Sequence, residues 1–339
     1  MNLNSMLNGS NSPLTKRRKN SAHIQNMLNS TPKSLSSKAK PKRYDTPPIW
    51  ALSFKTSGKS AKIEPNITSD KVGPGGLPSL LNLPATFSGV VPADDLSRRI
   101  CEWLYGHLTN LGERRKFIEL EFKLGQACSK TNNKRISLPV ISETLLENSY
   151  VNANVFFEPG VSNTLFSRVE GLVDKYTASS ALELLGSVCT RDQFHPSEGG
   201  ATVRVSLDEK DQLLEKITKL RISDLIVHFP HETVDIRVSL SLEIPFEGSS
   251  QDVRAPNLIR NKNRTSWKTM GARVDLTSVI VEGSGATKEI ELELDSSMLL
   301  KFYDHFEKQT DPQAMDKFEE LIRFGLDNCR VISRAISSG

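Results

Sequence analysis

The sequence predicts a mainly β protein with flanking helices, of the α+β class: a closed antiparallel eight-stranded β-barrel with helices packed outside. Between residues 181 and 294, strand-like runs follow one another without an intervening helix, which is typical of an antiparallel sheet. In several of these runs apolar residues alternate with charged ones, so these strands have one apolar and one charged face. Segments with helical periodicity flank the strands at about 94–111, 161–177, 296–308 and 312–335.

Composition divides the chain of 339 residues into two parts. The first ninety residues carry thirteen Lys/Arg and three Asp/Glu, whereas the remainder carries thirty-one and thirty-seven. Asn, Ser, Lys and Pro dominate residues 1–45, a composition typical of disorder. We therefore expect a disordered basic tail over 1–91 and a folded, mildly acidic domain over 92–339. The mildly acidic charge of the domain argues against polyanion binding across its whole surface.

Two segments of the tail each permit two interpretations. Thr15-Lys16-Arg17-Arg18-Lys19 is either a nuclear import signal or a solvated run of charge. Residues 47–54 concentrate Ile, Trp, Leu and Phe in a stretch too short to fold alone. This stretch is either a linear motif that anchors on a partner or a segment packed against its own domain.

The cysteines and the hydropathy pattern suggest a reducing compartment. Cys101, Cys128, Cys189 and Cys329 are widely spaced, and no pair has the spacing of zinc ligands, so we expect reduced thiols. No stretch resembles a signal peptide or a membrane span. We therefore expect an intracellular, soluble protein without membrane association.

Ordered structure is expected to begin near Pro92. Asp94 and Asp95 open the first helix, in which Ile100 and later apolar residues recur at helical spacing. Turn signals such as Glu282-Gly283-Ser284-Gly285 separate several strands. The strands are expected at 118–123, 183–190, 200–207, 219–229, 233–246, 257–268, 272–281 and 287–294.

Two strands far apart in sequence carry glutamates on one face. In the first, Glu119 and Glu121 lie opposite apolar residues. The second places Glu289, Glu291 and Glu293 on one face in the same way. Buried carboxylates are costly unless they are paired, and a hard divalent cation is one suitable partner. Because neither motif contains His or Cys, the two Glu-x-Glu pairs favour Mg²⁺ or Mn²⁺ over zinc.

Other strands carry cations opposite their apolar residues. In an ordinary antiparallel sheet such faces are solvated, whereas in a barrel they point inward under a layer of helices. Acids cluster on two strands and bases on three or four others, while a solvated face would mix the signs, so a charged interior is favoured. Facing carboxylates and cations would hold a metal ion and a polyphosphate. The cations are Arg204, Lys219, Arg221, Arg260, Lys262, Arg264 and Arg273.

The ordered motifs resemble those of fungal-type mRNA 5′-triphosphatases, the β subunits of mRNA capping enzymes, in the triphosphate tunnel metalloenzyme family. The first signature is similar to residues 117–125 and the last to 289–293, with 260–264 and 273–277 between them. The resemblance covers about residues 92–335. It implies a tunnel catalytic domain that removes the γ-phosphate from the 5′-triphosphate end of nascent mRNA, the first step of capping.

Where the motifs match, the resemblance also implies roles for individual residues. The ligands of Mg²⁺ or Mn²⁺ would be Glu119, Glu121, Glu291 and Glu293. The phosphates would contact Arg204, Lys262 and Arg264, with Lys219 beside them. Glu243 would orient the attacking water, and Glu289 and Asp275 would fix neighbouring cations. The tunnel would be supported by Lys123, Arg260 and Arg273.

Some assignments remain open at the level of sequence. Arg221 and Arg237 are also interpretable as external salt-bridge partners, which we favour for Arg237. There are two alternative functions. One is a non-catalytic phosphate-binding scaffold of the capping apparatus, and the other is a tunnel-family hydrolase of inorganic or thiamine triphosphate.

The resemblance extends to partners and location. Pro48-Ile49-Trp50-Ala51 resembles the family's guanylyltransferase-binding motif, although Leu52-Ser53-Phe54 departs from it. The resemblance therefore implies mRNA guanylyltransferase as a partner through the segment around Trp50. It also implies a homodimer, with the helix near 94–111 among the candidate contacts, and a nuclear location.

Overall fold

The structure is a computed structural model that describes residues 86–88, 93–197, 201–248 and 254–337. The chain divides into two units, Met1–Pro48 and Ile49–Gly339, and every described residue belongs to the second. The predictions made for residues 1–85, including the basic cluster, the disordered tail and the segment around Trp50, lie outside the described residues.

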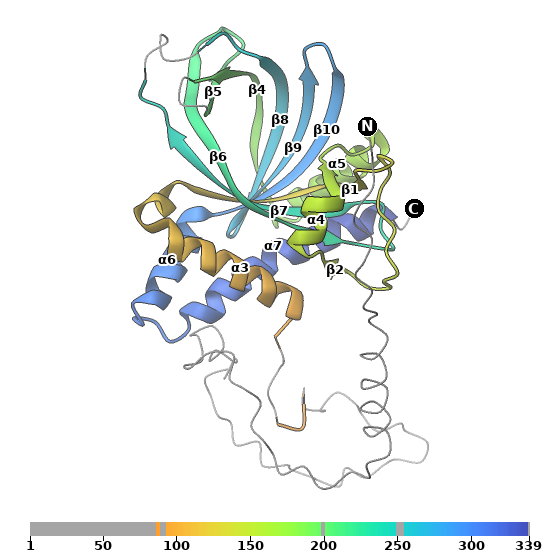
Figure 1. The fold of residues 1–339 in the computed structure, drawn as a ribbon, viewed down its shortest axis with the longest axis vertical. Helices are drawn as coiled ribbons and strands as arrows, with labels where there is room; N and C mark the ends of the chain where they lie inside the picture. Colours follow the sequence, from red (N-terminus) through yellow and green to blue (C-terminus); the bar gives the residue numbers. More distant parts are fainter. Residues whose placement is uncertain (1–85, 89–92, 198–200, 249–253, 338–339) are drawn as a thin grey trace, which may run out of the picture. The chain divides into compact units, whose positions relative to one another are not determined.

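Eight antiparallel strands close into a barrel, which confirms the predicted fold (Figure 1). Around the barrel the order is β1-β7-β6-β5-β4-β8-β9-β10, and β10 pairs back with β1. A closed sheet has no exposed edge along the strands that pair on both sides. The strands are β1 (Ile118–Ser129), β4 (Glu183–Pro196), β5 (Thr202–Leu207), β6 (Leu213–His228), β7 (Asp235–Pro245), β8 (Leu258–Thr269), β9 (Ala272–Val281) and β10 (Gly285–Leu294).

Strand β7 shows how alternation sorts the side chains. Val238, Leu240 and Leu242 are fully buried in the main hydrophobic core on the outer face of the barrel. Arg237 and Glu243, on the opposite face, line the interior. The same period of two places the glutamates of β1 and β10 inside and their leucines outside.

The four predicted helices are present and cover part of the barrel. They are α3 (Asp95–Leu111), α5 (Asn163–Ala178), α6 (Ser296–Glu307) and α7 (Ala314–Ser337). α7 contacts the other three helices and also β1 and β10 (Figure 1). The buried face of α3 includes Ile100, Leu104 and Leu108, so these residues stabilise the chain's own core. A short 3₁₀ helix, η2 (Gly112–Phe117), joins α3 to β1.

Three short elements between β1 and α5 were not predicted: β2 (Thr144–Leu145), α4 (Asn148–Asn154) and β3 (Val155–Glu158). They are too short to show a periodic hydrophobic pattern. β3 pairs with the end of β1 beyond the barrel, and β2 pairs with β6. Close by, the buried Asp235 carboxylate accepts hydrogen bonds from Arg135 Nε and the Ala127 backbone N–H, both at 2.9 Å.

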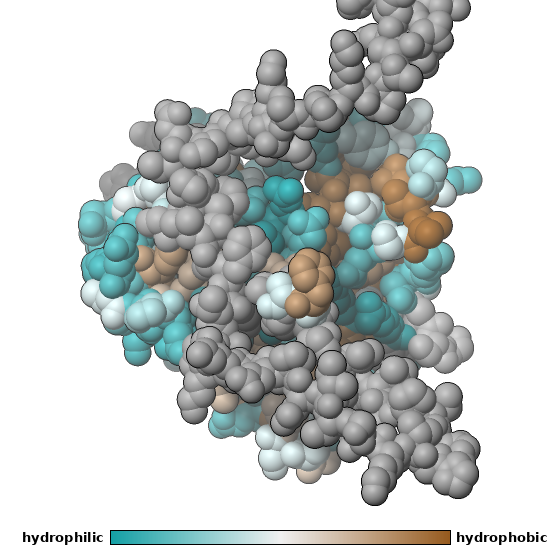
Figure 2. Space-filling view, turned by 90° about the horizontal axis from the view of Figure 1, so that it is seen from below, coloured by the Kyte–Doolittle hydropathy of each residue, from teal (hydrophilic) through white to brown (hydrophobic). Residues whose placement is uncertain are grey.

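All four cysteines are free thiols, and Cys101, Cys128 and Cys329 are buried. None of the helices in the described ranges combines the length and apolar character needed to cross a bilayer. Figure 2 views the molecule from below relative to Figure 1. On this side, hydrophilic side chains cover much of the described surface, together with a hydrophobic area.

Candidate active site

The barrel encloses a cavity of about 480 Å³ whose lining is almost entirely ionic. All eight strands contribute to it, because successive side chains of a strand point to opposite faces and one set points into the barrel. The lining comprises seven carboxylates, nine cations and Phe194.

Eleven of the twelve predicted site residues line this cavity: Glu119, Glu121, Arg204, Lys219, Glu243, Arg260, Lys262, Arg264, Glu289, Glu291 and Glu293. The twelfth, Asp275, lies buried directly behind the lining. Its Oδ2 is 3.1 Å from both Arg264 Nη1 and Arg273 Nε. Asp275 therefore fixes two cations of the cavity without reaching the space itself.

The glutamates of β1 and β10 are held by cations of neighbouring strands. Glu119 accepts hydrogen bonds from Lys219 and, at 3.3 Å, from Ser241 Oγ. Glu293 accepts one from Arg273 Nη2 at 2.6 Å. These pairs offset part of the cost of burying carboxylates close together.

Lys123 occupies the centre of the acidic side. Its ammonium group lies 3.1 Å from Glu289, 3.7 Å from Glu121 and in direct contact with Glu291. Burial acts to lower the pKa of Lys123, but the three carboxylates outweigh it and raise the pKa. The lysine is therefore a fixed positive charge among the glutamates.

Burial and neighbouring charges separate the pKa values of the glutamates. Burial raises the pKa of Glu293 to about 7, against the opposing effect of Arg273. Burial and the nearby Glu291 raise the pKa of Glu121. Burial would also raise the pKa of Glu291, but Lys123 and Arg264 lower it to about 2. The glutamates of this site therefore differ in pKa according to their own burial and charged neighbours.

The carboxylate oxygens are suitable ligands for a divalent cation, although most of these carboxylates form ion pairs with lysine or arginine. Within the described ranges, no three His, Cys, Asp or Glu side chains converge as a ready-made metal site. The four predicted ligands are all hard oxygen donors, and Oε1 of Glu121 is buried without a hydrogen-bond partner. A bound cation would satisfy that oxygen and lower the cost of burying ionised Glu121 and Glu293.

The opposite wall is basic, and acidic neighbours position its cations. Lys262 Nζ lies 2.5 Å from the buried Asp192. Arg204 Nη2 lies 2.7 Å from Glu215 and 3.4 Å from Glu243. Each of these cations is therefore held by at least one carboxylate, and both line the cavity where a polyanion could contact them.

Our interpretation of Arg237 as an external salt-bridge partner is wrong. Arg237 lines the cavity, 3.9 Å from Glu121 Oε1, and its guanidinium lies 5.0 Å from the centre of the Phe157 ring. The alternation of β7 requires this, because Arg237 shares a face with Glu243. Arg221 also lines the cavity, and it pairs with Asp224 at 3.0 Å.

Two lining residues were not identified from the sequence. Glu215 lies on β6, which begins at Leu213 rather than at 219, and Phe194 lies on β4, which continues past 190 to Pro196. In both cases the predicted strand was too short. Continuing the alternation from Lys219 back to Glu215 would have found the first of them.

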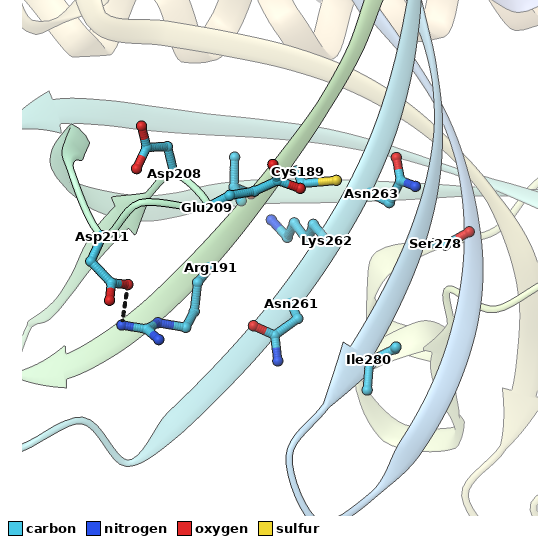
Figure 3. Close-up of a pocket in the computed structure, with 11 residues that line it drawn as sticks. Cys189, Arg191, Asp208, Glu209, Asp211, Asn261, Lys262, Asn263, Ser278 and Ile280 are labelled. Atoms are coloured by element: carbon cyan, nitrogen blue, oxygen red, sulfur yellow. Dashed lines mark ion pairs between the residues drawn. The ribbon is translucent and has the colours of Figure 1, made fainter.

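A second pocket, of about 560 Å³, lies on the outer face of the barrel and lacks the glutamates of β1 and β10 (Figure 3). Asn261 and Asn263 alternate with the inward-facing Lys262, and they contribute amide groups to this outer pocket. The turn after β5 borders it, where Asp211 forms an ion pair of 2.6 Å with Arg191. The inner cavity, which contains the predicted site, is the smaller of the two.

A closed barrel with a lumen of facing glutamates, lysines and arginines defines a tunnel protein built to hold a polyanion. A family model described as mRNA capping enzyme, beta chain, matches residues 90–338. The chain belongs to this family of capping-enzyme β chains, which confirms the resemblance seen in the sequence.

Individual relatives agree with the family match. The mRNA-capping enzyme subunit beta of Yarrowia lipolytica is 28% identical over 321 residues, covering 88% of this chain and 81% of the relative. That of Debaryomyces hansenii is 28% identical over 357 residues, covering 89% and 73%. The structure of the S. pombe Pct1 RNA triphosphatase has a similar fold, with a TM-score of 0.67 and 22% identity over 77% of this chain and 99% of that one.

Proposed function

We propose that this chain is a metal-dependent mRNA 5′-triphosphatase, which removes the γ-phosphate from 5′-triphosphate RNA in the first step of capping. One observation carries the proposal: four inward glutamates on two strands face a set of inward lysines and arginines in one closed cavity. Membership of the capping-enzyme β-chain family supports the RNA substrate. The product would be an RNA with a diphosphate end and free phosphate.

Glu119, Glu121, Glu291 and Glu293 would hold Mg²⁺ or Mn²⁺. When bound, such an ion neutralises phosphate charge and acts as a Lewis acid. The chemistry of the carboxylates supports this role, as does Oε1 of Glu121, which is buried without a hydrogen-bond partner.

The basic wall would bind the triphosphate. Arg204, Lys262 and Arg264 would contact phosphate oxygens, and Lys219 would lie beside them. Asp192 and Asp275 hold two of these cations in place before the substrate arrives. Cations already positioned where negative charge develops stabilise a phosphoryl-transfer transition state without reorganisation.

Glu243 would orient the attacking water. Its carboxylate lies 3.2 Å from Lys219 and 3.4 Å from Arg204, so it sits among the groups that would hold the phosphates. Glu289 would position cations, since it accepts hydrogen bonds from Lys123 at 3.1 Å and Arg260 at 2.7 Å. No covalent intermediate is required by this arrangement.

The proposal extends to the capping apparatus. The chain would bind mRNA guanylyltransferase through the segment around Trp50, form a homodimer and act in the nucleus. Trp50→Ala is expected to weaken co-purification with guanylyltransferase while triphosphate hydrolysis is unchanged. Undiminished co-purification would contradict the role of this segment.

The proposed activity is tested with a panel of substrates in Mg²⁺ and in Mn²⁺. RNA labelled in its γ-phosphate should yield free phosphate, and RNA labelled in its α-phosphate should yield a diphosphate end. Release of pyrophosphate, or hydrolysis of thiamine triphosphate or inorganic tripolyphosphate without hydrolysis of RNA, would contradict the proposal.

A further inference from the structure

Among the described residues, seventeen line the inner cavity, and Phe194 is the only uncharged one. It is partly exposed to that cavity rather than fully buried. It also belongs to none of the hydrophobic core clusters formed by the described residues. Core packing therefore does not explain why an aromatic ring faces a lumen otherwise built for ions.

The position of Phe194 along the barrel is informative. It lies two residues before the end of β4, and its register partner on β8 is Leu258, the first residue of that strand. Leu258 is 38% exposed. Phe194 thus lies with a second apolar residue at the end of the β4–β8 pair, which is one end of the barrel and which we call the mouth.

Cations adjoin this apolar pair on the inner side. Arg204 is the register partner of Phe194 on β5, and Arg260 follows two residues after Leu258 on the same face of β8. Deeper along the inner face of β4, Asp192 anchors Lys262. From this mouth inward, Phe194 is followed by basic residues of the lining.

This order matches the chemistry of a 5′-nucleoside triphosphate, which joins a flat aromatic base to a polyanion. An aromatic side chain stacks on any base through its π-face, whereas lysine and arginine pair with phosphates. The opposite end of β4 and β8 differs. There, Arg273 and Glu293 adjoin a pocket of about 320 Å³ whose lining contains no aromatic side chain among the described residues.

We propose that Phe194 is a specificity-determining residue that stacks on the base of the 5′-terminal nucleotide, and that the nucleoside end of the substrate occupies the mouth beside Phe194 with its triphosphate directed inward. This assignment rests on the proposed triphosphatase function and adds to it the orientation of the substrate. It also predicts discrimination between nucleotide substrates and inorganic tripolyphosphate.

The test compares three substrates that share a triphosphate: 5′-triphosphate RNA, the same RNA with an abasic first nucleotide, and inorganic tripolyphosphate. Phe194→Ala should lower kcat/KM for triphosphate RNA roughly ten-fold more than for tripolyphosphate, as expected for loss of one base stack. The abasic RNA should behave like tripolyphosphate. Phe194→Trp, which keeps an aromatic face, should restore the preference.

Phe246→Ala is the matched control. Phe246 is also half-buried, but it follows β7 and lies against Lys216 rather than lining the cavity. It should leave the ratio of the two kcat/KM values unchanged. Equal losses on RNA and tripolyphosphate in Phe194→Ala, or a loss that Phe194→Trp does not reverse, would overturn the assignment. An inactive parent chain would instead refute the proposed function.

Discussion

Glu121 and Glu293 lie directly opposite each other in the register of β1 and β10, the pair of strands that closes the barrel. Two of the proposed metal ligands are therefore brought together by the same pairing that completes the fold. Glu119 and Glu291 lie two residues away on the same inward faces. Loss of barrel closure would thus separate the acidic residues of the site, which couples the integrity of the fold to catalysis.

The buried ammonium group of Lys123 should be needed for stability. Lys123→Met removes the cation that contacts Glu289, Glu291 and Glu121, and leaves these carboxylates buried with less compensation. The free energy of unfolding is expected to fall by about 3 kcal/mol, within the range for breaking a buried ion pair. Guanidinium denaturation at neutral pH measures this change. Lys301→Met, at an exposed position of α6, serves as the control and should change the value little. Equal effects of the two substitutions would contradict the account.

Gly125 should be intolerant of a side chain. A Cβ atom at this position would lie 2.1 Å from the backbone oxygen of Glu158 and 2.7 Å from the ring of Phe157, both on β3. Gly125→Ala is therefore expected to lower the free energy of unfolding by about 2 kcal/mol, because β3 must move away from β1. Gly171 in α5 has open space around its Cβ position, so Gly171→Ala should raise stability by about 0.5–1 kcal/mol. Thermal melts that shift in the same direction for both variants would refute this prediction.

Asp94 should stabilise the start of α3 in a pH-dependent way. It caps the helix by accepting a hydrogen bond from the Ser97 backbone N–H at 2.9 Å, and it lies 3.5 Å from Arg330. Burial acts to raise the pKa of Asp94, but Ser97 and Arg330 lower it below 3.8. Asp94→Ala should therefore cost about 1 kcal/mol at neutral pH.

The sign of the pH effect follows from the lowered pKa. A carboxylate whose pKa is depressed in the folded state stabilises the protein above its unfolded pKa, and this stabilisation is lost as the pH falls through the folded value. The difference in unfolding free energy between the parent and Asp94→Ala should thus be constant near pH 7 and shrink below pH 3.8. Urea denaturation across this range tests it, with the exposed Asp95→Ala as the control. A difference that grows on acidification would contradict the prediction.

Alternation along long strands made the barrel and its inward residues predictable. β7 runs from Asp235 to Pro245 without irregularity, so its two faces could be assigned from the sequence. Arg237 was placed on the wrong side, although the same alternation groups it with Glu243. The error lay in treating an isolated charge on a strand as solvated, when its partner Glu121 comes from a distant segment.

Other features depend on geometry that the sequence pattern does not contain. The register of β6 shifts between Arg221 and Ser223, and this bulge changes which residues face inward. After it, Ser223 faces α3 and accepts a hydrogen bond from Trp103 Nε1 at 3.0 Å. β2, α4 and β3 are held by pairing and packing with β6 and β1 rather than by a periodic pattern of their own. The closure of the barrel also determines which cation pairs with which carboxylate.

The most direct test of the account is release of γ-phosphate from 5′-triphosphate RNA in Mg²⁺ or Mn²⁺ by the parent chain and by Glu121→Ala and Glu293→Ala. The exposed Glu282→Ala, in the turn between β9 and β10, is the matched control. We predict that the parent and the control are active. Both cavity variants should lose activity by at least about a hundred-fold, roughly the effect of deleting a major electrostatic contribution to catalysis. Circular dichroism should show that these variants are still folded. Full activity in the cavity variants, or an inactive folded parent supplied with metal, would contradict the claim that these glutamates form the catalytic metal site of a triphosphatase.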